Sequence, residues 1–147
     1  MIYIATTTIN KPTKSLKRFA NNKNCKLIVA LDKKTPEFKL KNAIILSTNY
    51  QEKTWPKLSK LIGWNCIQRR NFAILEAYKR GAKLIGLIDD DNIPYKNWFK
   101  NIFVGKKIKA NEIKTNKRFF DPIGLTNYKN LWHRGFPIEL VNKRKYS

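Results

Sequence analysis

The sequence predicts an α/β protein built on a parallel sheet, and three observations point to that class. Four short apolar runs, at residues 2–5, 27–31, 43–46 and 84–88, are continuous rather than alternating, as in strands that are covered on both faces. Helical patterns lie between the first two runs and before the fourth. Polar side chains follow every run. We therefore expect strands that alternate with helices and are joined by right-handed crossovers.

Capping residues and apolar spacing predict the helices. Residues 15–21 form a plausible first helix after a Pro-Thr pair, and residues 69–80 form the clearest one, which Gly81 ends. Residues 95–103 are expected to form a short amphipathic helix, and 105–118 a hairpin or a loop. The link between the second and third strands is barely long enough for a crossover, so we expect it to be irregular.

Composition limits the class of protein more than it identifies a function. A chain of 147 residues with 42% hydrophobic residues is expected to fold as one domain. The formal charge of +21 is typical of proteins that bind nucleic acid, an anionic membrane or an acidic ligand. The lysines are scattered along the chain, however, so we interpret most of them as solvated surface.

The two cysteines are isolated and do not have zinc-ligand spacing, so we expect reduced thiols. The sequence shows no signal peptide and no apolar stretch long enough to cross a bilayer, and a cytoplasmic location is expected.

Three consecutive carboxylates, Asp89, Asp90 and Asp91, follow the fourth strand in a chain with only ten acidic residues. Adjacent anions repel one another, so such a cluster stays solvated or is neutralised by a cation. Ligands bind beyond the carboxyl ends of strands in open α/β sheets, and hard oxygen ligands suit Mg²⁺ or Mn²⁺. The alternative is an acidic loop tip or a helix N-cap.

The other strand ends also carry groups that suit a nucleotide. Thr6, Thr7 and Thr8 end the first strand, and their hydroxyls can bond a base or ribose; the alternative is β-propensity followed by a turn. Asp32 ends the second strand and can accept a hydrogen bond from a base or ribose hydroxyl.

The start of the main helix predicts a phosphate site. Arg69, Arg70 and Asn71 combine positive charge with the free N–H groups of a helix N-terminus. The alternative is that an arginine packs its stem on the sheet or pairs with a nearby Asp. His133, the only histidine, is more simply structural, and Asp121 and Glu139 are the remaining carboxylates considered as a general base.

Several ordered segments resemble a known enzyme family. Arg70-Asn71, Gly81-Ala82-Lys83 and a hydrophobic strand running into Asp89-Asp90-Asp91-Asn92 are similar to the nucleotide-sugar half of GT-A glycosyltransferases. Residues 30–36, 69–92 and 132–137 more narrowly resemble the STELLO-type glycosyltransferases and, more distantly, the reversibly glycosylated polypeptides. The resemblance runs from Ile4 to about Leu140. His133 stands where that motif tends to have Pro, so no metal role transfers to it.

The resemblance implies a GT-A (Rossmann-like) nucleotide-binding sheet flanked by helices, with the first and fourth strands adjacent. It implies one domain over 1–147, with a nucleotide-sugar-binding part at 1–103 and a short acceptor-side part at 104–147. The donor would be a nucleoside-diphosphate sugar, usually a UDP-sugar. Mn²⁺ or Mg²⁺ would bridge its pyrophosphate and the Asp-x-Asp motif.

Residue roles follow from the same resemblance. Asp89 and Asp91 would form the Asp-x-Asp motif, with Asp91 the better candidate for metal contact and Asp89 for ribose or sugar contact. Asp32 and Thr7 would hold the nucleoside, and Arg70 the diphosphate. The expected function is a metal-dependent glycosyltransferase that acts on an unknown acceptor hydroxyl, and the stereochemistry of transfer is left open.

Three other functions are compatible with part of the sequence. A nucleotidyltransferase is disfavoured because no Gly-rich loop follows the first strand. A basic nucleic-acid-binding module is the main alternative, although no sequence-specific RNA- or DNA-binding signature is present. A degenerate glycosyltransferase would bind a donor without turnover. Peripheral contact with an anionic membrane and the oligomeric state are left open.

Overall fold

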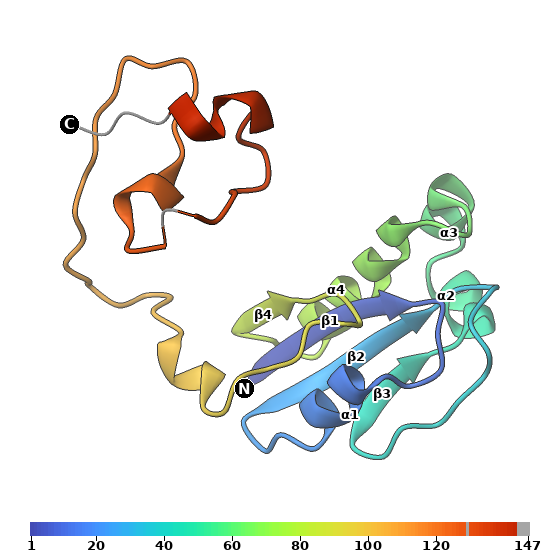
Figure 1. Cartoon of the computed structure of the whole chain (residues 1–147). Helices are drawn as coiled ribbons and strands as arrows, with labels where there is room; N and C mark the ends of the chain where they lie inside the picture. The colour runs from blue at the N-terminus through green and yellow to red at the C-terminus, as the bar shows by residue number, and fades with distance from the viewer. Residues whose placement is uncertain (129, 144–147) are drawn as a thin grey trace. The chain divides into compact units, whose positions relative to one another are not determined.

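The computed structural model describes residues 1–128 and 130–143, and the chain forms two compact units (Figure 1). The first is Met1–Ile102 and the second is Phe103–Ser147. The first contains a four-stranded sheet and α-helices on its faces. The described part of the second contains the short 3₁₀ helices η3 (Pro122–Leu125) and η4 (Ile138–Lys143).

The sheet of the first unit is entirely parallel, which confirms the predicted class. Its strands are β1 (Ile2–Thr8), β2 (Cys25–Leu31), β3 (Ala43–Leu46) and β4 (Leu84–Leu87). Their order is β3-β2-β1-β4, so the chain lays β2 and β3 on one side of β1 and returns to place β4 on the other. The carboxyl ends of β1 and β4 therefore flank a topological switch point, the usual place for a ligand in such a sheet.

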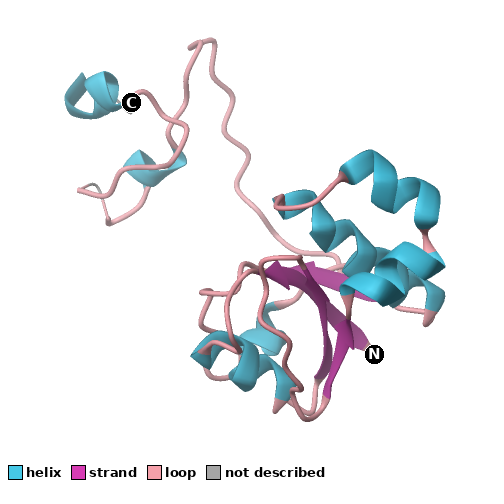
Figure 2. Cartoon of the chain, turned by 90° about the vertical axis from the view of Figure 1, so that its right-hand side faces the viewer, coloured by secondary structure: helices cyan, strands magenta, loops and turns pink. Residues whose placement is uncertain are grey.

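Helices cover both faces of the sheet (Figure 2). Helix α1 (Lys14–Ala20) packs on one face, with Leu16 and Phe19 in the same buried cluster as alternate residues of β2. On the other face lie α2 (Thr48–Thr54), α3 (Pro56–Ile62) and α4 (Arg70–Lys79), preceded by the 3₁₀ turn η1 (Ile67–Arg69).

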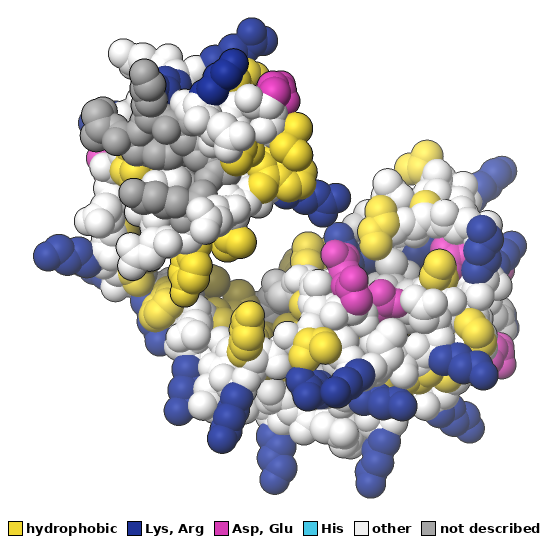
Figure 3. All heavy atoms as spheres, in the orientation of Figure 1, with side chains coloured by type: hydrophobic (Ala, Val, Ile, Leu, Met, Phe, Trp, Pro, Cys, Tyr) yellow, Lys and Arg dark blue, Asp and Glu magenta, His cyan; other side chains and the backbone are white. Residues whose placement is uncertain are grey.

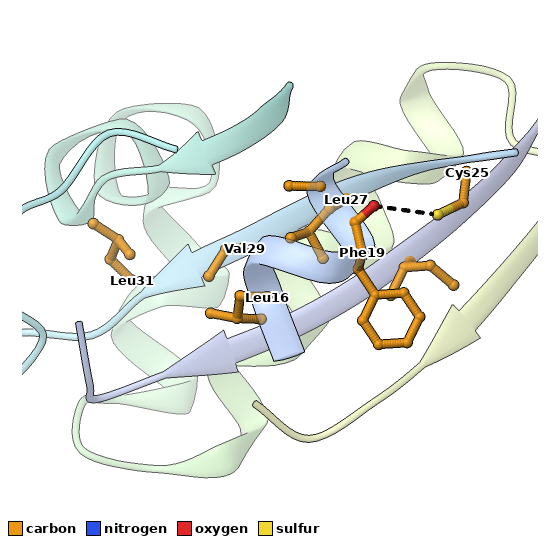
Figure 4. Close-up of a cluster of buried hydrophobic side chains, with 8 residues drawn as sticks. Leu16, Phe19, Cys25, Leu27, Val29 and Leu31 are labelled. Atoms are coloured by element: carbon orange, nitrogen blue, oxygen red, sulfur yellow. Dashed lines mark hydrogen bonds between the residues drawn. The ribbon is translucent and has the colours of Figure 1, made fainter. Parts of the chain in front are cut away.

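The position of β2 between two layers of helices explains why its sequence is continuously apolar. Leu27, Val29 and Leu31 face α1, as Figure 4 shows, while Ile28 and Ala30 belong to the cluster under α4. Both sets are buried, because successive side chains of a strand point to opposite faces and here each face carries a helix. Each fully buried aliphatic side chain of this kind stabilises the fold by roughly 1.5–3 kcal/mol.

The links between elements differ in part from the sequence predictions. The connection from β2 to β3 contains no helix, as expected. Helices α2 and α3 were not predicted, and residues 95–103 form only the 3₁₀ turn η2 (Trp98–Asn101). Residues 105–118 contain no strand in the structure, so of the two predicted alternatives, a hairpin or a loop, the loop is observed. No helix in the described ranges combines the length and the apolar character needed to cross a bilayer.

Candidate functional site

The ends of β1 and β4 meet, and threonine side chains of β1 donate hydrogen bonds to the segment that follows β4. Thr6 Oγ1 donates to the carbonyl oxygen of Ile88 at 2.9 Å. Thr8 Oγ1 donates to the carboxylate of Asp90. Adjacency of the first and fourth strands, expected from the resemblance, is thus observed: Ile2 to Ala5 pair in register with Leu84 to Leu87.

The segment Ile88–Asn92, here named the Asp loop, is closed by its last residue. The side-chain oxygen of Asn92 accepts from the backbone N–H of Asp89 at 2.9 Å, and the backbone N–H of Asn92 donates to the Asp89 carbonyl at 3.2 Å. The Asn92 amide also donates to Asp91 Oδ1 at 3.2 Å. Asp89 and Asp91 are exposed, whereas Asp90 is half-buried. Figure 3 shows acidic side chains gathered on one face of the first unit, while Lys and Arg side chains are scattered around it.

Side chains from the loop between β1 and α1, and from the first turn of α1, hold the Asp loop in place. Asn10 Nδ2 donates to Asp90 Oδ2 at 3.0 Å, Thr13 Oγ1 donates to the Asp90 carbonyl, and Ser15 Oγ donates to the Asn92 carbonyl. Thr13 also caps α1, since its Oγ1 accepts from Leu16 N at 3.2 Å. These three residues were missed by the sequence analysis; only the capping position of Thr13 was visible there.

The structure brings Arg70 to the Asp loop. Its Nη1 donates to Asp89 Oδ1 at 3.1 Å and to the Ile88 carbonyl at 3.3 Å. The side chain of Asn71, the next residue of α4, is exposed. Arg70 and Asp89 therefore come from distant parts of the sequence to the same rim of the sheet.

Arg69 lies in the interior, which corrects its predicted role in phosphate binding. It is fully buried, and its guanidinium stands 3.5 Å from the ring centre of Trp64 and 4.3 Å from that of Phe72. It donates to Gln51 Oε1, Ser59 Oγ and the Gly63 carbonyl, each at 3.1 Å. Burial lowers the pKa of this guanidinium, and Asp32 partly opposes that shift. Arg69 thus joins α2, α3 and α4. This agrees with the alternative given above, in which an arginine packs against the rest of the protein.

Asp32 and Thr7 make their hydrogen bonds within the protein. The Asp32 carboxylate is buried and accepts the backbone N–H of Asn65 at 2.8 Å and that of Cys66 at 3.3 Å. Thr7 Oγ1 donates to the Ala30 carbonyl at 2.8 Å. The expected direct contact of these two side chains with a nucleoside does not fit this arrangement. Instead, Asp32 anchors the turn that carries Trp64, a residue that the sequence analysis did not single out.

The Asp loop offers carboxylate oxygens, which are the type of ligand that a divalent cation prefers. It does not offer enough of them to complete the coordination shell. No group of three His, Cys, Asp or Glu side chains suited to a metal is present in the described ranges. Mg²⁺ sites in nucleotide-binding proteins commonly use one or two carboxylates, with water and substrate phosphates completing the shell. The exposed oxygens of Asp89 and Asp91 fit that type of site.

The two carboxylates considered as a general base belong to the second unit. Asp121 is 1% exposed, and its Oδ1 caps η3 by accepting from Ile123 N at 3.0 Å. Glu139 is exposed in the first turn of η4. In that unit Trp132 Nε1 also donates to the Phe136 carbonyl at 2.7 Å.

Comparison with known proteins does not place the chain in a family. No protein-family model matches it, and no curated protein sequence does. The class defined by fold and site is therefore an α/β protein with a polar, carboxylate-bearing rim at the switch point of a parallel sheet.

Proposed function

We propose that this protein is a metal-dependent glycosyltransferase of GT-A type that uses a nucleoside-diphosphate sugar, with a UDP-sugar as the first donor to test. The observation that carries the proposal is the grouping of Arg70, Asp89 and Asp91 beside the switch point between β1 and β4. The order of segments that resembles GT-A glycosyltransferases points to the same function.

Each residue at the rim has a chemical task in this proposal. Asp89 and Asp91 would hold Mn²⁺ or Mg²⁺, which when bound stabilises negative charge on the departing diphosphate. Arg70 would bind the diphosphate through a planar, permanently charged group suited to phosphate oxygens. Asp90, which accepts a hydrogen bond from Thr8, would keep the loop in position.

The two candidate general bases differ in their exposure. An inverting reaction needs a base that takes the proton of the attacking hydroxyl. Glu139 suits this task better than Asp121, because its carboxylate is exposed whereas that of Asp121 caps a 3₁₀ helix. A retaining enzyme, or a protein that binds the donor without turnover, would not need either residue.

Nucleotide titration tests the donor site directly. Thermal shift and calorimetry would use UDP, GDP, CDP and ADP, each with and without Mn²⁺. A ligand at a hundredfold excess over its dissociation constant stabilises the native state by about 2.7 kcal/mol, which is easily measured. We expect one nucleotide to bind only with the metal, and Asp91→Asn to abolish that binding while keeping stability within about 0.5 kcal/mol. Glu112→Gln, the same charge change in the second unit, is the matched control.

The charge of +21 favours one competing function, a basic module that binds nucleic acid. Such binding would weaken steeply with salt and would not respond to Asp91→Asn. Unchanged nucleotide affinity in Asp91→Asn, together with salt-sensitive binding of generic RNA or DNA, would replace the glycosyltransferase proposal with this one.

A further inference from the structure

The Asp loop already contains one cationic partner, and it belongs to the protein. Arg70 Nη1 lies 3.1 Å from Asp89 Oδ1. In the described ranges no other ion pair reaches Asp89, Asp90 or Asp91, because the remaining pairs involve Glu52, Glu76 and Glu112. An oxygen that the proposed metal site needs is therefore already bound to a guanidinium.

This ion pair is accessible enough to exchange. The Asp89 side chain is 63% exposed and that of Arg70 is 25% exposed. Exposed ion pairs of this kind change an equilibrium constant by only about two- to fivefold. By contrast, a guanidinium that meets a phosphate can form two parallel charge-assisted hydrogen bonds.

We infer that Arg70 exchanges partners between the two states of the site, an inference that rests on the proposed function. Without ligand, Arg70 neutralises Asp89 and so competes with a divalent cation for it. With a nucleoside diphosphate, Arg70 turns to the phosphate oxygens and leaves Asp89 free for the cation. Removing Arg70 should therefore have opposite effects on the two ligands, strengthening the binding of metal alone and weakening that of the nucleotide.

Binding measurements with Arg70→Gln test this exchange without any assay of activity. Free Mn²⁺ is counted by electron paramagnetic resonance in titrations without nucleotide, and UDP is titrated by calorimetry with Mn²⁺ present. Arg18→Gln is the matched control, because Arg18 is exposed on α1 and its loss lowers the net charge equally. Circular dichroism and thermal melting establish that the variants fold, and Arg70→Lys provides a milder second variant.

We expect Arg70→Gln to bind Mn²⁺ alone about two- to fivefold more tightly than wild type, and Arg18→Gln to match wild type. Both Arg70 variants should bind UDP more weakly. In an Asp89→Asn background, Arg70→Gln should no longer change Mn²⁺ affinity, because the pair is already broken.

Two results would overturn the inference, and they have different consequences for the proposed function. If wild type binds Mn²⁺ and UDP together but the Arg70 variants bind Mn²⁺ alone no more tightly than Arg18→Gln does, the exchange is wrong and the proposed function stands. If no variant binds Mn²⁺ or UDP, the proposed function and the exchange fail together.

Discussion

Thr13 is the residue through which stability and the candidate site can be tested together. Its hydroxyl accepts from Leu16 N at the start of α1 and donates to the carbonyl of Asp90. Thr13→Val keeps the β-branched shape and removes both bonds. Loss of a helix cap costs about 1 kcal/mol, and loss of a second hydrogen bond costs about as much again. We therefore expect Thr13→Val to lower the free energy of unfolding by about 2 kcal/mol.

Urea denaturation and thermal melting measure this loss, and Thr13→Ser is the matched control because it retains the hydroxyl. For a unit of this size, 1 kcal/mol corresponds to roughly 4–8 °C in Tm. Hydrogen exchange at the backbone amides of the Asp loop should be faster in Thr13→Val, since the loop loses one of its anchors. Equal stability of the Val and Ser variants would refute the reasoning, because the hydroxyl would then contribute nothing.

Other perturbations separate structural residues from residues of the site. Arg69→Leu should destabilise the fold by about 3 kcal/mol or more in urea denaturation, because three acceptors, two of them buried, lose their donor; a loss below 1 kcal/mol would contradict the buried role. Burial raises the pKa of the Cys25 thiol to about 11, so the half-buried Cys66 should react first with a thiol reagent. Because unfolded Cys25 loses its proton near pH 9, the free energy of unfolding should fall between pH 9 and 11, and by less in Cys25→Ala.

The sequence was sufficient to predict the parallel sheet but not the full set of helices. The four strands are strongly apolar and buried on both faces, so each one is visible locally. Helices α2 and α3 are short; α2 is mostly polar and buries only Gln51, and α3 buries only Ser59. Their formation depends on packing against Arg69 and the sheet, which local patterns do not reveal.

The same limit explains why the arginine pair was predicted only in part. Arg69 and Arg70 are adjacent, so neither composition nor spacing indicates which one faces the interior. That is decided by Gln51 and Ser59, which lie ten and more residues earlier and supply the acceptors for Arg69. Arg70, the next residue, points in a different direction from the helix, and its guanidinium donates to Asp89, nineteen positions later.

The three adjacent carboxylates illustrate how one local conflict is resolved in three ways. Repulsion requires each charge to be solvated or compensated. Asp89 is paired with Arg70, Asp90 accepts hydrogen bonds from Thr8 and Asn10, and Asp91 remains exposed beside the amide of Asn92. Asp91 is the least compensated of the three carboxylates, so under the proposed function it is the first place where a cation would gain by binding. That is the physical reason for proposing Asp91, rather than Asp90, as a metal ligand.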